Sequence, residues 1–125
     1  MSRQRDDGQA VVEVALALPL ICTLVIGILQ IALVGRNRLA LEVAAREAAR
    51  AAVVSADPAA AAVTAAHTAV TLRPLVVSVE AGTIADVPSI TASISWTDPT
   101  DMPIVGAFMP DIPLHTEVTM TIEPP

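Results

Sequence analysis

The hydrophobic pattern of this chain opens with one long apolar run that contains no charge. From Val14 to Gly35 every side chain is uncharged, and a run of this length can cross a bilayer as a single helix. The following residues, 36–56, contain neither Gly nor Pro and are rich in Ala, Leu, Arg and Glu, most of them strong helix formers. The pattern therefore predicts a membrane helix over 9–35 that continues as helix outside the membrane.

The helix predicted beyond the membrane carries an apolar stripe and one ion pair. We expect four apolar residues to share that stripe: Leu39, Val43, Ala44 and Val54. Glu42 and Arg46 are spaced to pair at i, i+4, a contact that contributes only about 0.3–0.5 kcal/mol. The pair therefore assists the helix and does not hold the fold.

A second helix is predicted directly after the first. Asp57 and Pro58 supply a capping acid followed by a proline at the first helical position. The alanine-rich residues 58–72 continue as helix, and Arg73-Pro74 ends it. His67 lies in this helix among Ala and Thr with no second ligand in reach along the sequence, so we interpret it as a surface or satisfied residue rather than a metal ligand.

The period then changes from helical to alternating, which predicts three strands. The first is Leu75–Glu80, closed by a turn at Ala81-Gly82. The second, 89–97, and the third, Leu114–Glu123, place apolar residues on one face. The inward residues are Ile90, Ala92, Ile94 and Trp96 in the second strand and Val118, Met120 and Ile122 in the third, whose outward residues are His115, Glu117, Thr119 and Thr121.

These elements predict an α+β fold with a single head domain outside the membrane. It consists of the long N-terminal helix, the alanine-rich second helix and a small three-stranded antiparallel sheet, with Trp96 as the anchor of the core. We expect the head to span 36–125, helical over 36–73 and made of strands and a loop over 74–125.

The segment 98–113, between the last two strands, is rich in proline yet carries four apolar residues: Ile104, Val105, Phe108 and Met109. Two interpretations stay open, a contact surface or a flap that covers a thin core. The acids of this segment are Asp98, Asp101 and Asp111, and they lack the spacing of an EF-hand loop. We interpret them as solvated loop residues.

Composition narrows the classes of function. The net charge of −6 argues against nucleic-acid binding, which needs clustered cations. Cys22 is the sole cysteine, so no internal disulfide can form, and we interpret it as a small apolar filler. The sequence contains no Ser-His-acid set and no glycine-rich phosphate loop, so we predict no enzymatic activity, no metal, no cofactor and no small-molecule substrate.

The polar residues at the start of the membrane helix are the candidate functional residues. Glu13 places a carboxylate at the mouth of this helix, which is costly unless something neutralises it, so it is a candidate assembly residue. Cleavage after Gly8 would free the amine of Gln9, which could pair with Glu13 of a neighbouring subunit. Pro19 removes one backbone hydrogen bond and is expected to kink the helix.

Gly8 and Glu13 ahead of an apolar helix follow the processing pattern of type IV prepilins. The stretches GQAVVEVALALPL and GILQIALVGRNRLALEVAAREAAR resemble TadE-like proteins, the pseudopilins of the Flp (tight-adherence) pilus machinery. The resemblance covers residues 7–52 closely and returns more loosely in HTEVTMTIEP.

The resemblance implies a minor pseudopilin that acts in pilus assembly, because the major pilins of that system are much shorter and lack a sheet domain. It implies a leader over 1–8, removed at Gly8 and Gln9 by a prepilin peptidase. The implied partners are membrane lipid and other pilins and pseudopilins, packed through the 9–35 helix with Glu13 supplying charge pairing. The implied location is the bacterial cytoplasmic membrane, crossed once, with the N-terminus cytoplasmic.

Some features of the sequence point elsewhere. The family usually carries an aromatic after the glutamate, where this chain has Val14. Two arginines precede the span and four follow it closely, which by the positive-inside rule favours the opposite orientation. A secretory signal peptide fits less well, because the apolar run is too long. The alternative function is an uncleaved single-pass accessory protein whose head domain binds a secretion or envelope partner.

Overall fold

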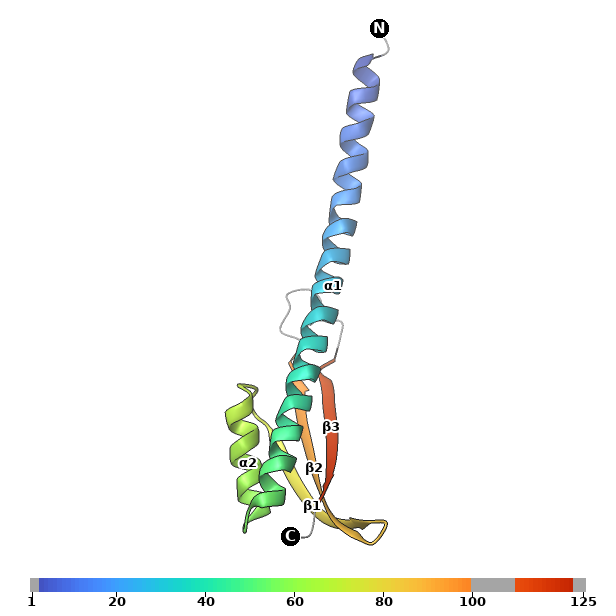
Figure 1. The fold of residues 1–125 in the computed structure, drawn as a ribbon. Coiled ribbons are helices and arrows are strands. Elements are labelled where there is room, and N and C mark those ends of the chain that lie inside the picture. The colour runs from blue at the N-terminus through green and yellow to red at the C-terminus, as the bar shows by residue number, and fades with distance from the viewer. Residues whose placement is uncertain (1–2, 100–109, 123–125) are drawn as a thin grey trace. The chain divides into compact units, whose positions relative to one another are not determined.

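The computed structural model describes residues 3–99 and 110–122, with side chains from Gly8 onward. Along the chain lie α1 (Arg3–Val54), α2 (Pro58–Ala69), β1 (Val76–Ile84), β2 (Val87–Asp98) and β3 (Ile112–Thr121) (Figure 1). A long N-terminal helix, a short second helix and a three-stranded antiparallel sheet confirm the predicted α+β class. The chain divides into two compact units, Met1–Leu33 and Val34–Pro125, and each is described by itself below.

The sheet of the second unit has the strand order β1-β2-β3, with both neighbouring pairs antiparallel. β1 and β2 are joined by a two-residue turn at Ala85-Asp86, where both residues have positive φ (49° and 65°). The predicted turn at Ala81-Gly82 is wrong, because these residues pair with Ile90 and Ser89 inside the ladder. A Cβ at Gly82 would lie 3.6 Å from the Ser89 hydroxyl oxygen, in ordinary contact, so the ladder does not require a glycine there.

The alternation predicted for β2 is confirmed, with its apolar side chains buried at every second position. Ile90, Ala92, Ile94 and Trp96 are all buried. The Trp96 indole Nε1 donates a long hydrogen bond, 3.4 Å, to the carbonyl oxygen of Arg73. Trp96 is thus part of the core, although the largest completely buried side chains are Leu41 and Ile94.

The alternation in β3 is also confirmed. The inward positions Val118, Met120 and Ile122 are half-buried and pack against the core, whereas His115, Glu117, Thr119 and Thr121 are exposed. The strand runs from Ile112 to Thr121, so it begins before the predicted Leu114. The outer face is polar, and the Thr91 and Thr119 hydroxyls lie 2.8 Å apart across the ladder.

The start of α2 follows the sequence prediction closely. The Asp57 Oδ1 accepts a 3.1 Å hydrogen bond from the Ala60 backbone N–H, and Pro58 occupies the first turn. This satisfies one of the amide groups left free at a helix start.

The end of α2 differs from the prediction, because the helix stops at Ala69 rather than at residue 72. Val70 is already extended (φ −139°, ψ 156°). The Arg73 guanidinium folds back and donates hydrogen bonds to the carbonyl oxygens of His67, Val70 and Leu72. Arg73 therefore satisfies carbonyl groups at this end of the helix from a position four residues beyond it.

The core of the second unit is built largely from alanine. The buried face of its helices, 0–1% exposed, comprises Leu41, Ala44, Ala45, Ala48, Ala49 and Ala52 from α1 and Ala62 and Ala66 from α2. These residues form one cluster with the inward side chains of β2. In Figure 1, α2 lies beside the C-terminal part of α1, and the sheet lies against these helices.

The four residues of the predicted stripe do not share one face of this part of α1, because Ala44 lies on a different side from the other three. Ala44 is fully buried, but Leu39, Val43 and Val54 are 65%, 49% and 83% exposed. Small side chains let the helix approach the sheet and α2 closely, so close packing selects the alanine face and leaves the larger residues outside. The predicted pair of Arg46 and Glu42 is confirmed, with 3.7 Å between Nη2 and Oε2.

Candidate membrane anchor and assembly site

The first unit contains most of the apolar part of α1. Within the described residues, α1 is the one helix long and apolar enough to cross a membrane by length and composition, with a mean hydropathy of 2.5 over its best window. Most of its large apolar side chains are exposed, as at Leu16 (75% exposed), Leu20 (73%) and Ile31 (74%). Such exposure in water would be costly, at about 25 cal/mol per Å². The segment is therefore suited to an apolar environment.

Glu13 lies one turn and a half inside α1 from Gly8, and its side chain is exposed. Among the residues whose side chains the structure describes, no basic group lies within ion-pair distance of it. The first basic residue after it in the sequence is Arg36, which belongs to the second unit. Charge compensation for Glu13 in an apolar environment must therefore come from outside this part of the chain.

Glu13 shares a stripe of the helix with Leu20 and Gly27, because the three are seven residues apart. Leu20 and Gly27 belong to a hollow of about 380 Å³ on the surface of α1, lined by Leu20, Thr23, Leu24, Gly27, Ile28 and Ile31. The missing side chain of Gly27 leaves room in this otherwise apolar wall. Small residues at such positions let a second helix approach closely in a membrane. The carboxylate and the hollow thus lie along one side of the helix.

Gly8 has no packing reason to be glycine. A Cβ added there would meet nothing within 4 Å, and glycine in a helix costs about 1 kcal/mol relative to alanine. The structure places the Gly8–Gln9 bond inside α1, which begins at Arg3. A peptidase that acts on this bond must therefore open the first turns of the helix, and glycine lowers the cost of that opening.

Pro19 lies within α1, which continues through it. Proline has no N–H to offer the carbonyl of residue 15, and the Thr23 hydroxyl donates a 2.8 Å hydrogen bond to the Pro19 carbonyl oxygen. The polar group of Thr23 is thereby satisfied within its own helix, as an apolar environment requires. A kink at Pro19 remains a prediction.

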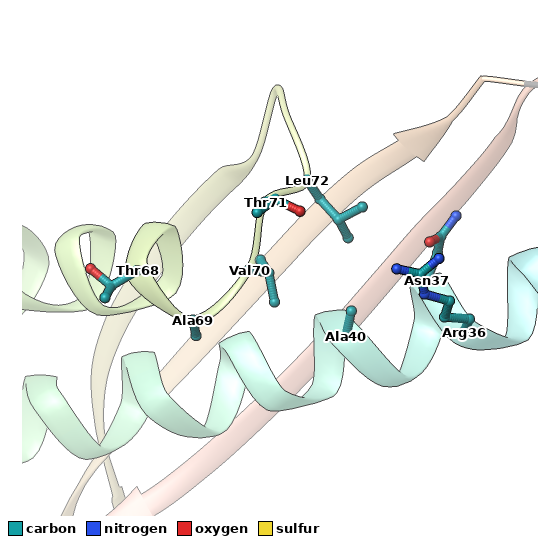
Figure 2. A pocket seen from close by; sticks show the side chains of 8 residues that line it. All are labelled: Arg36, Asn37, Ala40, Thr68, Ala69, Val70, Thr71 and Leu72. Carbon is teal, nitrogen blue, oxygen red and sulfur yellow. The ribbon is translucent and has the colours of Figure 1, made fainter.

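The head unit has a hollow of about 250 Å³ between α1 and the segment after α2 (Figure 2). Its lining residues are Arg36, Asn37, Ala40, Thr68, Ala69, Val70, Thr71 and Leu72. Leu72 points toward the side chains of Arg36 and Asn37 in Figure 2. The lining contains one guanidinium, one amide and two hydroxyls, with neither carboxylate nor imidazole among its side chains. This set lacks a general base, so it does not make a catalytic site.

The amide of Asn37 makes a contact that the sequence analysis missed. Its Nδ2 donates a 3.0 Å hydrogen bond to Oδ2 of Asp98, a carboxylate only 7% exposed at the end of β2. The interpretation of Asp98 as a solvated loop residue is therefore wrong. The signal was available, because Asp98 continues the inward alternation of Ile94 and Trp96 by one more step.

The remaining candidates are placed as follows. His67 is half-buried in α2, and its carbonyl accepts from Arg73. Cys22 is an exposed free thiol on α1. Within residues 3–99 and 110–122, no group of three or more His, Cys, Asp or Glu side chains is placed to hold a metal ion. Asp101, Ile104, Val105, Phe108 and Met109 lie outside the described residues.

One comparison with known families gives a match, and it lies within α1. Residues 8–50 match the family model described as "TadE-like protein". Over these residues the chain is similar to TadE-like proteins. The match begins at Gly8, contains Glu13 and the hollow around Gly27, and extends into the alanine face of the head. It confirms the resemblance predicted from the sequence.

The TadE-like segment and its apolar helix fit a membrane-anchored component of the Tad pilus machinery. The TadE-like family is a structural family associated with pili rather than a family of enzymes. No curated protein and no solved structure matches the chain.

Proposed function

We propose that this protein is a minor pseudopilin of the Tad pilus, anchored in the cytoplasmic membrane by the first part of α1 and cleaved after Gly8. In its mature form it packs beside other pilins and pseudopilins through residues 9–35. The head carried by the second unit remains outside the membrane. Assembly, not catalysis, is its role.

The observation that carries this proposal is the carboxylate of Glu13, which has no basic partner among the described side chains and lies on the same side of the helix as the hollow around Gly27. A carboxylate in this setting is stabilised by a cation close by. Cleavage after Gly8 creates one, because the amine of Gln9 is protonated at neutral pH. A neighbouring helix seated in the hollow would place its own Gln9 amine beside Glu13 of this chain. Equally, it would place its own Glu13 beside the Gln9 amine of this chain.

One observation favours a second candidate, an uncleaved single-pass accessory protein whose head binds a secretion or envelope partner. The Gly8–Gln9 bond lies within a helix, and Val14 stands where the family usually has an aromatic residue. Both features slow cleavage. In this candidate, Glu13 pairs with a cation of a different protein and the leader stays in place.

The deciding experiment is the mass of the protein recovered from membranes of cells that carry the complete pilus gene set. Under the proposal the recovered chain starts at Gln9 and has lost the first eight residues. Gly8→Val blocks this loss, whereas Gly35→Val does not. Gly35 is a matched control, since it also lies in α1 and a Cβ added there meets nothing within 4 Å.

Recovery of an intact chain in the presence of the peptidase contradicts processing and favours the accessory protein. A second variant tests the assembly step separately. Glu13→Gln removes the charge while keeping the shape, so the chain should be inserted and cleaved but should fail to join pilin partners. Normal piliation with Glu13→Gln would remove Glu13 from the mechanism.

A further inference from the structure

The head part of α1 has its large and small apolar residues on unexpected sides. The residues turned into the core are mostly alanines, while Leu39, Val43 and Val54 are turned outward. A helix that needs only its own core would normally place the larger side chains inside, because their burial contributes more. Single exposed apolar residues are common, but here three of them occupy one side of one helix.

Those three residues form a continuous seam with two arginines. Leu39, Val43, Arg46, Arg50 and Val54 are separated by four, three, four and four residues, a spacing that keeps them on one side of an α-helix. At 3.6 residues per turn this side is opposite the buried Ala45, Ala48 and Ala52. We call these five residues the outer seam. Its spacing is that of a helix that packs against another helix.

The charges of the outer seam argue against pairing with a parallel copy in register. In such a pair each seam residue faces its own counterpart, so Arg46 would face Arg46 and Arg50 would face Arg50 of the second copy. The flanking Glu42 and Glu47, five residues apart, would face each other across the pair as well. Like charges at these positions are destabilising.

An antiparallel pair of copies would bring opposite charges together, but two chains anchored in the same membrane cannot adopt it. There Arg46 would face Glu47 of the second copy, and Leu39 would face Val54. Two chains that enter one membrane in the same orientation leave it in the same direction, so their helices run parallel. This step rests on the membrane-anchored function proposed above.

We propose that the outer seam binds the helix of a different membrane-anchored protein. That helix runs parallel to α1 and carries apolar residues opposite Leu39 and Val43. It carries carboxylates opposite Arg46 and Arg50. The arginines thus select the partner, because they repel a parallel copy of this chain and attract an acidic helix. Glu42, 3.7 Å from Arg46, holds one of the two guanidinium groups at the edge of the seam.

The test uses the full chain in cells that carry the complete pilus gene set. A photoreactive residue replaces Val43 in the outer seam or, as a control, Val76, which is 63% exposed on the outer face of β1. After irradiation, mass spectrometry identifies what is joined to each position. The expected product at Val43, and not at Val76, joins the chain to another protein at an acidic helical stretch beside its membrane span.

Charge substitutions then decide whether the arginines select that partner. Arg50→Glu should lower the yield of the product about ten-fold, because it places like charges together. Arg38→Glu, an equal change at an exposed arginine outside the seam, should change it by less than about two-fold. A carboxylate-to-arginine change in the partner should restore the yield with Arg50→Glu and lower it with the native chain.

Several results would overturn the inference. They are a product between two copies of this chain, a product with lipid alone, no product beyond that at Val76, or equal losses with Arg50→Glu and Arg38→Glu. If the proposed function itself is wrong, the same experiment gives a different result. A chain absent from the membrane removes both proposals, whereas a membrane-bound, cleaved chain that forms no product at Val43 removes only this one.

Discussion

The two parts of α1 contain similar apolar residues but differ in which of them the chain buries. In the first unit, large aliphatic residues such as Leu16 and Leu20 cover the whole circumference, and none of them is buried by the chain. In the second unit, alanines such as Ala48 and Ala52 are fully buried, while Leu39 and Val54 are exposed. One helix thus has two different surroundings. In the first unit its large side chains are exposed, and in the second unit its small side chains are buried in the core.

The difference shows what each part of the helix packs against. An element that is apolar all round has no core of its own and is typical of a membrane span. An element with a small-residue face lies close to its neighbours, and the area it buries per residue is small. The head is thus stabilised by close packing and by the β2 side chains rather than by α1 alone. Changes in the two parts should accordingly have separate consequences.

The largest effect is expected from charges placed in the first part of α1. Leu20→Arg combined with Leu24→Arg should cost about 6 kcal/mol of membrane insertion, since each arginine near the centre of a span costs about 3 kcal/mol. Alkaline extraction of membranes should then release most of the chain. Leu39→Arg with Val43→Arg, on the exposed side of the head, should leave the chain in the membrane. Retention of both variants would show that the first part is not the anchor.

The next effect concerns the core of the head. Ile94 is fully buried, and Ile94→Ala should lower the free energy of unfolding by about 2–5 kcal/mol through lost burial and a remaining cavity. Unfolding of the full chain in detergent can be followed by the fluorescence of Trp96, the only tryptophan. Val76→Ala, at an exposed site of β1, should cost less than about 0.5 kcal/mol. Equal losses at the two sites would contradict the layer arrangement.

A third prediction tests the small size of the inward face of α1. Ala48→Leu adds three carbons at a position with no exposed surface, and overpacking of this kind costs about 1–3 kcal/mol. The matched change on the opposite side is Val43→Leu, which should alter stability by less than about 0.5 kcal/mol. Both are measured by the same fluorescence. A stabilising Ala48→Leu would mean that the alanine face leaves unfilled space.

Local signals of the sequence predicted much of this structure. The Asp57 cap, the alternation of β2 and β3, and the pairing of Glu42 with Arg46 are contacts between near neighbours, or periods that a strand imposes on its own residues. The predicted α+β class followed from the same periods. Each of these depends on short-range geometry, which the sequence states directly.

The predictions that failed concern contacts between elements that are distant in the sequence. The apolar stripe on the head part of α1 was predicted from size and hydrophobicity, but close packing chose Ala44 and its alanine neighbours over Leu39. The burial of Asp98 depends on Asn37, 61 residues away. At the candidate site, Glu13 was found from its cost in a membrane. The hollow around Gly27 was missed, although its seven-residue spacing from Leu20 can be read from the sequence.

The smallest predicted effect lies in the turn between β1 and β2, where local preference and structure disagree. Ala85 and Asp86 both have positive φ, as a two-residue hairpin turn of this hand requires, yet glycine is favoured at the second position. Asp86→Gly should therefore raise the free energy of unfolding by about 0.5–1 kcal/mol. Gly82→Ala, within β1, is the control variant, because Gly82 does not have a positive φ. If Asp86→Gly lowers stability, the Asp86 side chain contributes more than the left-handed backbone costs, and the hairpin is held by a side-chain contact rather than by its ladder.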